Sequence, residues 1–483
     1  MRKSISKIEY GDFQTPPELA RQICYKLSQL GIAPEIIVEP TCGSGAFIKA
    51  SLQCFAPTTQ ILGIEINPNH LEQLRQELRL QSQNLRVSLR QADFFSLDWA
   101  ALLRETKGNV LVLGNLPWVT NSAQGMLGGM NLPQKTNFLF QKGMDALTGK
   151  SNFDISEWML IQLAEALQER QGTLAMLCKT SVARKLMQHL YQKQCPVATA
   201  ALYKIDAAQH FGVAVDAGLL VCRFDKGAGD FTYTIYSALT DPVGCRTGWR
   251  KNVMVSNLLA FDETQELFGN SACKWRSGIK HDCAEVMELT AINGQLVNGI
   301  GEIVSLEDDF LYPLLKGADV ANHRHSTNRY LLVPQKSPGE DTRGLQTFAP
   351  RTWAYLEAHA DYFHRRKSRI YQLAPPFSVF GIGSYSFAPW KIAICGLYKK
   401  LDFNLIGPLY EKPIVFDDTV YFLSFATEAE AREVFAFLTR EKTLKFLDSM
   451  IFWDEKRPVK SGILNNLKLP ILSPQLNWLS EMQ

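Results

Sequence analysis

Apolar runs and amphipathic stretches alternate along the first half of the chain. The stretches with the apolar spacing of helices are residues 17–30, 45–55, 70–81, 155–170 and 182–192. The short apolar runs expected to form strands are residues 36–40, 60–66, 85–95, 108–115, 172–178, 201–205 and 217–224. Strands that alternate with helices in this way predict βαβ units and a mostly parallel sheet with helices on both of its faces.

The pattern changes beyond about residue 240. Short strands, glycines and loops with scattered aromatic residues replace the regular alternation there. The chain has 483 residues, which is long enough for two or three domains. We therefore expect an α/β domain over residues 1–240 and a second domain, of mixed α/β structure, over residues 241–483.

The composition indicates the cellular compartment but does not identify a binding partner. The net charge is +3 and the pI about 8.2, so any nucleic-acid site must be a local cluster of basic residues. The sequence has no apolar leader and no run of about 18 apolar residues, and we expect a cytoplasmic protein outside the membrane. The ten cysteines form no CxxC pair and are expected to be free thiols. Cys273, His281 and Cys283 come nearest to a metal-binding set, but without paired cysteines we expect no metal site.

A glycine-rich stretch, "VEPTCGSGAF" at residues 38–47, follows the first expected strand and opens a helix. Glycines at such a turn let the backbone pass close to a ligand. The spacing of Gly43 and Gly45 begins a dinucleotide-binding pattern, but the third glycine of that pattern would fall at Ile48. Glu39 also stands at the end of the strand, where its charge would repel a phosphate. An ammonium or sulfonium ligand suits this turn better than a pyrophosphate.

Acidic residues stand at the ends of three successive expected strands. Glu65 comes twenty residues after Gly45 and is placed to hold ribose hydroxyls. Asp93 ends the next strand and suits an exocyclic amine. Together with Glu39, these carboxylates fit a positively charged nucleoside, S-adenosylmethionine. The alternative is a helix-capping loop with incidental carboxylates.

The run "LVLGNLPWVT" at residues 111–120 ends a buried strand on Asn115, and the order of motifs around it resembles a known family. The sequence is similar to the gamma-class N6-adenine DNA methyltransferases of restriction–modification systems. "GDFQTPPELA" at 11–20 resembles their N-terminal cofactor motif, and the glycine-rich stretch, "GIEINP", "ADFF" and "GNLPW" follow in the family's order. The resemblance covers residues 1–225.

This resemblance carries expectations for fold and partners. It implies a Rossmann-like S-adenosylmethionine-dependent methyltransferase domain, followed by a C-terminal target recognition domain. The expected substrate is double-stranded DNA, and the expected cofactor is S-adenosyl-L-methionine. A cognate restriction endonuclease, encoded separately, is an expected partner of such a system.

The family's chemistry gives each residue of the "NLPW" turn a role. An aromatic amine is a poor nucleophile, because its lone pair is delocalised into the ring. The resemblance implies that Asn115 Oδ1 and the backbone carbonyl of Leu116 accept from the amine and free this lone pair. Pro117 favours an extended backbone at Leu116 and so helps to aim the carbonyl. Trp118 offers a flat surface to a flipped adenine, and Phe211 matches a second base-stacking aromatic, with an ordinary core phenylalanine as the alternative.

Leu116 replaces the proline usual at this place, and we expect the change to be tolerated because only the carbonyl is used. Asn-Leu-Pro-aromatic turns also resemble those of rRNA adenine dimethyltransferases. The residues expected to act in catalysis are Asn115, Leu116, Pro117, Trp118 and Phe211. The residues expected to bind the cofactor are Thr15, Glu39, Thr41, Cys42, Gly43, Gly45, Glu65, Ile66, Asp93, Phe94, Asn115 and Pro117.

The densest basic cluster lies in the second half of the chain. Its members are His323, Arg324, His325, Arg329, Lys336, Arg343, Arg351, Arg365, Arg366, Lys367 and Arg369. Basic residues mixed with tyrosines can neutralise phosphates and read bases, and a solvated charged face is the alternative. The stretch "FGIGSYSFAPWK" at residues 380–391 suits a loop that enters a DNA groove, and equally a plain β-turn.

Other functions share part of these motifs. An RNA adenine-N6 methyltransferase would share every motif through Trp118, and a protein-glutamine methyltransferase can use a similar turn. A catalytically silent DNA-binding module is the alternative outside the enzymes. The presence of Asn115, Glu65 and Asp93 argues against such a module.

Overall fold

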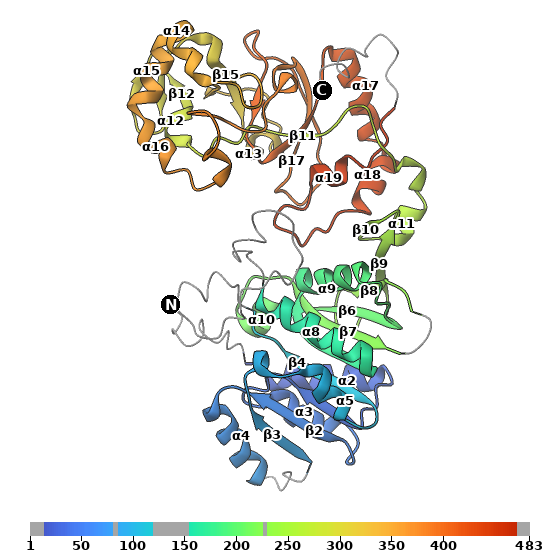
Figure 1. Cartoon of the computed structure of the whole chain (residues 1–483). Helices are drawn as coiled ribbons and strands as arrows, with labels where there is room; N and C mark the ends of the chain where they lie inside the picture. The colour runs from blue at the N-terminus through green and yellow to red at the C-terminus, as the bar shows by residue number, and fades with distance from the viewer. Residues whose placement is uncertain (1–13, 81–85, 119–153, 226–228, 471–483) are drawn as a thin grey trace. The chain divides into compact units, whose positions relative to one another are not determined.

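The computed structural model describes residues 14–80, 86–118, 154–225 and 229–470 (Figure 1). Two compact units divide the chain, residues 1–258 and residues 259–483. The change of pattern near residue 240 comes before this division because strands β9 and β10 continue the sheet of the first unit beyond that residue. Strand β8 pairs with β6 in parallel, and β9 then pairs with both β8 and β10.

The described residues of the first unit form one sheet with the strand order β10-β9-β8-β6-β7-β5-β4-β1-β2-β3. Its strands are β1 (Ile36–Glu39), β2 (Gln60–Glu65), β3 (Val87–Gln91), β4 (Val110–Asn115), β5 (Gly172–Lys179), β6 (Thr199–Ile205), β7 (Ala217–Phe224), β8 (Tyr233–Tyr236), β9 (Gly244–Arg250) and β10 (Val253–Val255). Strands β3, β2, β1, β4 and β5 are parallel, and β7 runs antiparallel between β5 and β6. The expected mostly parallel α/β sheet is confirmed.

Helices cover both faces of this sheet. They are α2 (Pro17–Gln29), α3 (Ala46–Cys54), α4 (Pro68–Leu80), α5 (Trp99–Glu105), α8 (Ile155–Arg170), α9 (Thr180–Gln192) and α10 (Ala207–Phe211). Alternation along β4 explains the two cores, because successive side chains of a strand point to opposite faces. Val110 and Val112 join the core under α5, α8 and α9, whereas Leu111 and Leu113 join the core under α2, α3 and α4. Both faces of β4 are therefore dry, as its continuous apolar run predicts.

The second unit is a mixed α/β structure, with two sheets over the residues up to 470 that the structure describes. Their strand orders are β11-β20-β17-β18 and β14-β13-β12-β16-β15-β19. The strands are β11 (Arg276–Ser277), β12 (Glu288–Ile292), β13 (Gln295–Asn298), β14 (Ile303–Val304), β15 (Leu311–Leu315), β16 (Arg329–Leu332), β17 (Trp390–Cys395), β18 (Asn404–Ile406), β19 (Val415–Phe416) and β20 (Val420–Phe425).

The helices of this unit are short. They are α11 (Leu258–Asp262), α12 (Ala284–Met287), α13 (Gly317–Ala321), α14 (Leu345–Phe348), α15 (Pro350–Ala358), α16 (Ala360–His364), α17 (Glu428–Leu438), α18 (Glu441–Asp448) and α19 (Ser461–Leu464). Helix α17 begins at a capping box, in which the side chains of Thr427 and Glu430 each accept from the other's backbone N–H. Across the part of the chain described above, every helix is too short or too polar to span a bilayer.

Candidate active site

The carboxyl ends of four parallel strands meet at one edge of the first sheet. Strand β1 lies between β4 and β2, and β3 follows β2. Glu39 ends β1 and pairs in register with Gly63 of β2, and Glu65 ends β2 and pairs with Gln91 of β3. Asn115 ends β4 on the other side of β1. The order of strands reverses at β1, and the crevice beside such a reversal is where open α/β sheets bind ligands.

The glycine-rich loop between β1 and α3 takes a conformation that only glycine adopts easily. Gly43 and Gly45 have φ angles of +50° and +79°. A Cβ atom at Gly45 would lie 2.4 Å from Leu74 Cδ1, and one at Gly43 would lie 2.7 Å from Gln14 Oε1. The backbone N–H of Ser44 also donates to Gln14 Oε1, at 3.0 Å. The loop is thus packed against α4 on one side and the segment before α2 on the other.

Glu65 holds this loop in place. One of its carboxylate oxygens accepts from the backbone N–H of Gly43 and the other from that of Asn67, both at 2.8 Å. A carboxylate has about four acceptor positions, so the two backbone bonds leave room for further donors such as hydroxyl groups. Glu65 therefore has a structural role in addition to the cofactor role expected for it.

Glu39 is a buried carboxyl group, with 3% of its surface exposed. Burial, together with the neighbouring Glu65 carboxylate, raises the pKa of Glu39 well above its ordinary value, and a backbone hydrogen bond from Ile48 opposes this rise. Its Oε2 atom has no hydrogen-bond partner in the described part of the chain. A buried acceptor without a donor is costly, and a cationic or proton-donating ligand would satisfy it.

The exchange Glu39→Gln is expected to make the protein without cofactor more resistant to alkaline pH. A carboxyl group whose pKa is raised in the fold loses its stabilising contribution as the pH rises above its unfolded value, 4.5. The free energy of unfolding of the variant should therefore rise relative to that of the wild type as the pH increases above about 5. Urea denaturation at several pH values measures this difference.

Glu72→Gln, an exchange on the exposed face of α4, is the matched control for that comparison. A difference between Glu39→Gln and wild type that stays constant across the pH range would show that the carboxyl group of Glu39 ionises as easily in the fold as in the unfolded chain.

Other residues expected to bind the cofactor differ in their burial and in their contacts. Asp93 follows β3, and its Oδ1 atom accepts from the backbone N–H of Phe95 at 3.0 Å. Phe94 is buried, with its ring centroid 4.6 Å from that of Trp99, so its side chain belongs to the core. Cys42 is also buried, and burial raises the pKa of its thiol. The cofactor roles of Asp93, Phe94, Cys42 and Ile66 stay predictions.

Asn115 is held by two threonines from distant parts of the chain. Its side-chain Nδ2 atom donates to Thr15 Oγ1 at 3.3 Å, and its backbone carbonyl accepts from Thr41 Oγ1 at 3.0 Å. Thr15 is 8% exposed and precedes α2, and Thr41 lies in the glycine-rich loop. The bond to Thr15 orients the amide, since it assigns the nitrogen to one side and leaves Oδ1 on the other.

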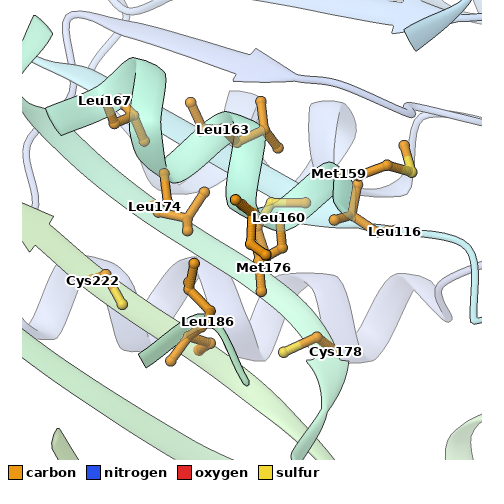
Figure 2. Close-up of a cluster of buried hydrophobic side chains, with 14 of the residues drawn as sticks. Leu116, Met159, Leu160, Leu163, Leu167, Leu174, Met176, Cys178, Leu186 and Cys222 are labelled. Carbon is orange, nitrogen blue, oxygen red and sulfur yellow. The ribbon is translucent and has the colours of Figure 1, made fainter. Parts of the chain in front are cut away.

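The side chain of Leu116 is part of the apolar core, with 1% of its surface exposed. Figure 2 shows it beside Met159 of α8, in the cluster that also contains Leu160 and Met176. A leucine at this position therefore contributes packing as well as its carbonyl. A proline here would keep the carbonyl and lose part of this packing.

Trp118 and Phe211 lie together, although 93 positions separate 118 from 211. Their ring centroids are 5.0 Å apart and the rings meet edge to face at 60°. Trp118 is buried, whereas Phe211 at the end of α10 is half-buried. The expected pairing of the two aromatics is thus present, and their contact with a base stays a prediction.

The basic cluster of residues 321–371 belongs to the second unit, and several of its members face acids there. Arg324 and Arg329 both pair with the buried carboxylate of Asp319. The Nε atom of Arg351 pairs with Glu307 at 3.1 Å. These arginines have structural partners, which a count of basic residues along the sequence does not reveal.

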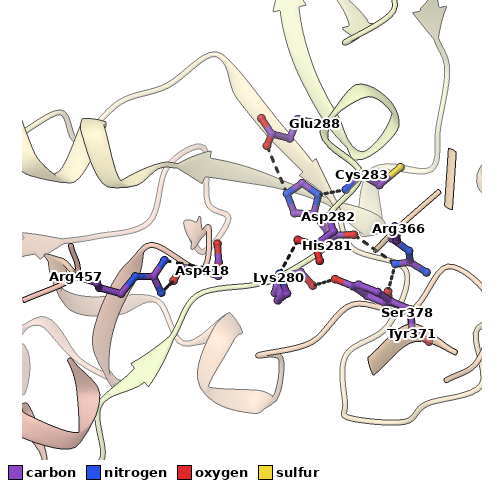
Figure 3. Close-up of polar contacts among 10 residues, drawn as sticks. All are labelled: Lys280, His281, Asp282, Cys283, Glu288, Arg366, Tyr371, Ser378, Asp418 and Arg457. Carbon is purple, nitrogen blue, oxygen red and sulfur yellow. Dashed lines mark hydrogen bonds and ion pairs between the residues drawn. The ribbon is translucent and has the colours of Figure 1, made fainter. Parts of the chain in front are cut away.

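Two further expectations concern side chains that turn out to be packed. Tyr385, in a 3-10 turn at Ser384–Phe387, is half-buried, and the Arg276 guanidinium lies 5.0 Å from its ring centroid. His281 accepts from the backbone N–H of Cys283 at 3.3 Å and faces Glu288 (Figure 3). All ten cysteines, which lie within the described ranges, are free thiols.

Sequence reasoning missed Gln14, which binds the glycine-rich loop. The Oε1 atom of Gln14 accepts from both the backbone N–H and the hydroxyl group of Ser44. The signal was present, because Gln14 directly precedes Thr15 in the N-terminal motif. Without a structure, nothing in the pattern shows that a glutamine at this place reaches a loop thirty residues away.

Comparison with known proteins places the chain in a family. No protein-family model matches it. It is 51% identical over 470 residues to the Type II methyltransferase M.NspV of Nostoc sp. (strain ATCC 29411 / PCC 7524), covering 97% of this chain and 98% of that protein. Among solved structures, the Type IIL restriction-modification enzyme MmeI, in complex with DNA, is similar in fold, with a TM-score of 0.56 and 12% identity. That match covers 96% of this chain and 65% of MmeI. Because the identity to M.NspV extends over nearly the full length of both proteins, the chain belongs to the Type II methyltransferase family.

Proposed function

We propose that this methyltransferase transfers a methyl group from S-adenosylmethionine to N6 of an adenine flipped out of double-stranded DNA. In this proposal it acts at a specific sequence, in the cytoplasm, and protects DNA in a restriction–modification system whose endonuclease is encoded separately. The observation that carries the proposal is the position of Asn115, which ends β4 next to the carboxylates of β1 and β2. The similarity to the Type II methyltransferase M.NspV, and to MmeI in its complex with DNA, supports DNA as the class of substrate.

The residues of the sheet edge fit S-adenosylmethionine. The unpartnered Oε2 atom of buried Glu39 suits a positively charged group. The backbone at Gly43 and Gly45 packs directly against Gln14 and Leu74, which fixes the glycine-rich loop at the sheet edge, and Glu65 retains acceptor positions for ribose hydroxyls. Asp93 follows the neighbouring strand and would accept from the adenine amine of the cofactor. The bound cofactor would supply an electrophilic methyl group on a sulfonium.

Asn115 and Leu116 would activate the target amine. The Oδ1 atom of Asn115 and the carbonyl of Leu116 accept from the two N6 hydrogens, and the nitrogen lone pair becomes available for attack. Thr15 is a positioning residue in this scheme, because its bond to Nδ2 keeps the amide from turning its donor toward the amine. Thr41 fixes the same residue through the backbone.

The aromatic pair would receive the flipped base. Stacking a base between two rings requires about 7 Å between them, twice the contact distance of carbon atoms. The centroids of Trp118 and Phe211 are 5.0 Å apart and edge to face. A base that stacks on Trp118 would therefore displace Phe211, or meet its edge. Phe211 is the half-buried and so the more easily moved of the two.

The exchange Phe211→Ala is expected to weaken capture of the flipped base by roughly 1–3 kcal/mol, the usual contribution of a base–aromatic stack. The measurement is the apparent affinity for DNA and the turnover per folded molecule, together with the melting temperature of the same preparation. An ordinary core phenylalanine would give a different result, namely a lower melting temperature with unchanged turnover.

Sequencing of DNA from an expressing host, with detection of modified bases, tests the proposed function. The expected result is N6-methyladenine in one sequence context, absent from a host that carries the Asn115→Ala variant. Unmodified DNA together with methylated adenine in the host's RNA would instead identify an RNA methyltransferase. Modification of neither nucleic acid would contradict the proposed function.

A further inference from the structure

An exposed apolar tip lies in the second unit, between α16 and β17. Leu373 is 100% exposed and Ile370, three residues earlier, is 42% exposed. The side chains of Arg365, Lys367 and Arg369 precede the tip and are also exposed. The sequence contains no acidic residue between Asp361 and Asp402, so the segment that carries the tip is purely cationic.

The segment is held firmly at its base by Arg366. The guanidinium of Arg366 donates to the backbone carbonyl of Ser378 at 2.7 Å and to that of His281 at 3.4 Å. It also lies over the ring of Tyr371, 3.7 Å from the ring centroid; Figure 3 shows the two side chains next to each other. The hydroxyl group of Tyr371 donates in turn to the carbonyl of Lys280 at 3.3 Å. Arg366 therefore acts as a clamp between the two sides of the loop.

The tip itself is a tight turn. The backbone N–H of Gln372 donates to the backbone carbonyl of Arg369 at 3.1 Å, and that of Ala374 donates to the backbone carbonyl of Tyr371 at 3.4 Å. Two prolines, 375 and 376, follow and fix φ at each position. Leu373 is thus presented to solvent by a turn whose conformation is set in advance. A preorganised apolar group of this kind loses little conformational entropy when a partner covers it.

The positive charge around the tip indicates which kind of partner it would bind. Exposed arginine and lysine side chains beside an apolar residue match the surface of nucleic acid, where phosphates flank stacked bases. Proteins that kink DNA insert leucine or isoleucine side chains between base pairs and hold the adjacent phosphates with basic residues. We propose that Leu373, supported by Ile370, is a wedge that enters between base pairs of bound DNA, while Arg365, Lys367 and Arg369 contact the phosphates beside it. This inference rests on the proposed function, since it requires DNA as the substrate.

The test measures binding and bending of a labelled 30-base-pair duplex that carries the sequence found modified in the host. Dyes at its two ends report bending by energy transfer. The full-length Leu373→Ala variant is expected to bind on the order of tenfold more weakly and to bend the duplex less. A tenfold loss corresponds to the lower end of the free energy gained when a leucine side chain is buried. Because no charge is lost, the variant's salt dependence should equal that of the wild type.

Three further variants are compared with Leu373→Ala: a matched control, a variant that removes a charge, and a variant that removes the clamp. Leu259→Ala removes a leucine that is 70% exposed elsewhere in the second unit and should bind and bend like the wild type. Arg369→Ala should lower the slope of log affinity against log salt by about one. Arg366→Ala should lower the melting temperature, because it removes the clamp.

The outcomes separate the wedge from the proposed function. A wild type that binds no DNA contradicts the proposed function itself. DNA binding with equal bending by Leu373→Ala and Leu259→Ala overturns the wedge alone. Self-association of the wild type that Leu373→Ala abolishes, seen by sedimentation with bending unchanged, would assign the tip to a contact with a second copy of the chain and also overturn the wedge.

Discussion

Replacing Asn115 with alanine is expected to reduce methyl transfer at least about a hundredfold while S-adenosylmethionine still binds. Under the proposed function the exchange removes the acceptor for the target amine, and loss of one such group typically costs about 2.7–4 kcal/mol in the transition state. The carboxylates of Glu39 and Glu65 stay in place, so cofactor affinity should change little. Single-turnover transfer of a radiolabelled methyl group, with calorimetry of cofactor binding on the same preparation, measures both quantities.

Asn109→Ala is the matched control for this variant. Asn109 is an exposed asparagine just before the opposite end of the same strand, and its contacts with Glu35 use the backbone. Its exchange should leave both transfer and binding close to wild type. If Asn115→Ala methylates DNA at nearly the wild-type rate, the amine is activated by other groups and the proposed mechanism is wrong.

Replacing Glu65 with alanine is expected to weaken S-adenosylmethionine binding by roughly 1.5–3 kcal/mol, the range for losing hydrogen bonds to a charged acceptor. The structure adds a second reason for this effect. The carboxylate also holds the backbone N–H groups of Gly43 and Asn67, so its removal loosens the loop that would contact the cofactor. Isothermal calorimetry measures the change in affinity.

Two further variants separate the causes of that loss. Glu65→Gln keeps an acceptor oxygen and removes the charge, and so should fall between wild type and Glu65→Ala. Glu72→Ala removes an exposed carboxylate of α4 and should bind the cofactor normally. Unchanged affinity in Glu65→Ala would remove this residue from the cofactor site and leave it the loop-holding role alone.

The catalytic half of the fold could be predicted because its signals are local. Each apolar run from β1 to β7 is bounded by turn residues and became a strand, and the alternation with helices determines which strands are parallel. The placement of Glu39, Glu65 and Asn115 at one edge then follows from topology, since parallel strands end on the same side. The approach of Phe211 to Trp118 was expected from motif order, and the structure confirms the contact between them.

Features that depend on distant partners could not be predicted in the same way. Arg366 stands in a basic run, yet its guanidinium is taken up by Ser378, His281 and Tyr371. No periodicity reports such a contact, because the partner carbonyls are up to 85 residues away. The extension of the first sheet through β8 to β10, beyond residue 240, was not predicted either. Strand β8 pairs with β6 only after the chain has crossed β7, and such a register is a property of the folded sheet.

The burial of Glu39 has a consequence for the end of the catalytic cycle. Under the proposed function, Glu39 is ionised while it faces a positively charged substrate and is prone to take up a proton otherwise. Methyl transfer converts the sulfonium to a neutral thioether, so the carboxyl group then faces one positive charge fewer. A carboxylate in a dry site is less well stabilised when one of the positive charges that it faces is lost. Glu39 would thereby favour the incoming cofactor over the spent one and limit inhibition by product.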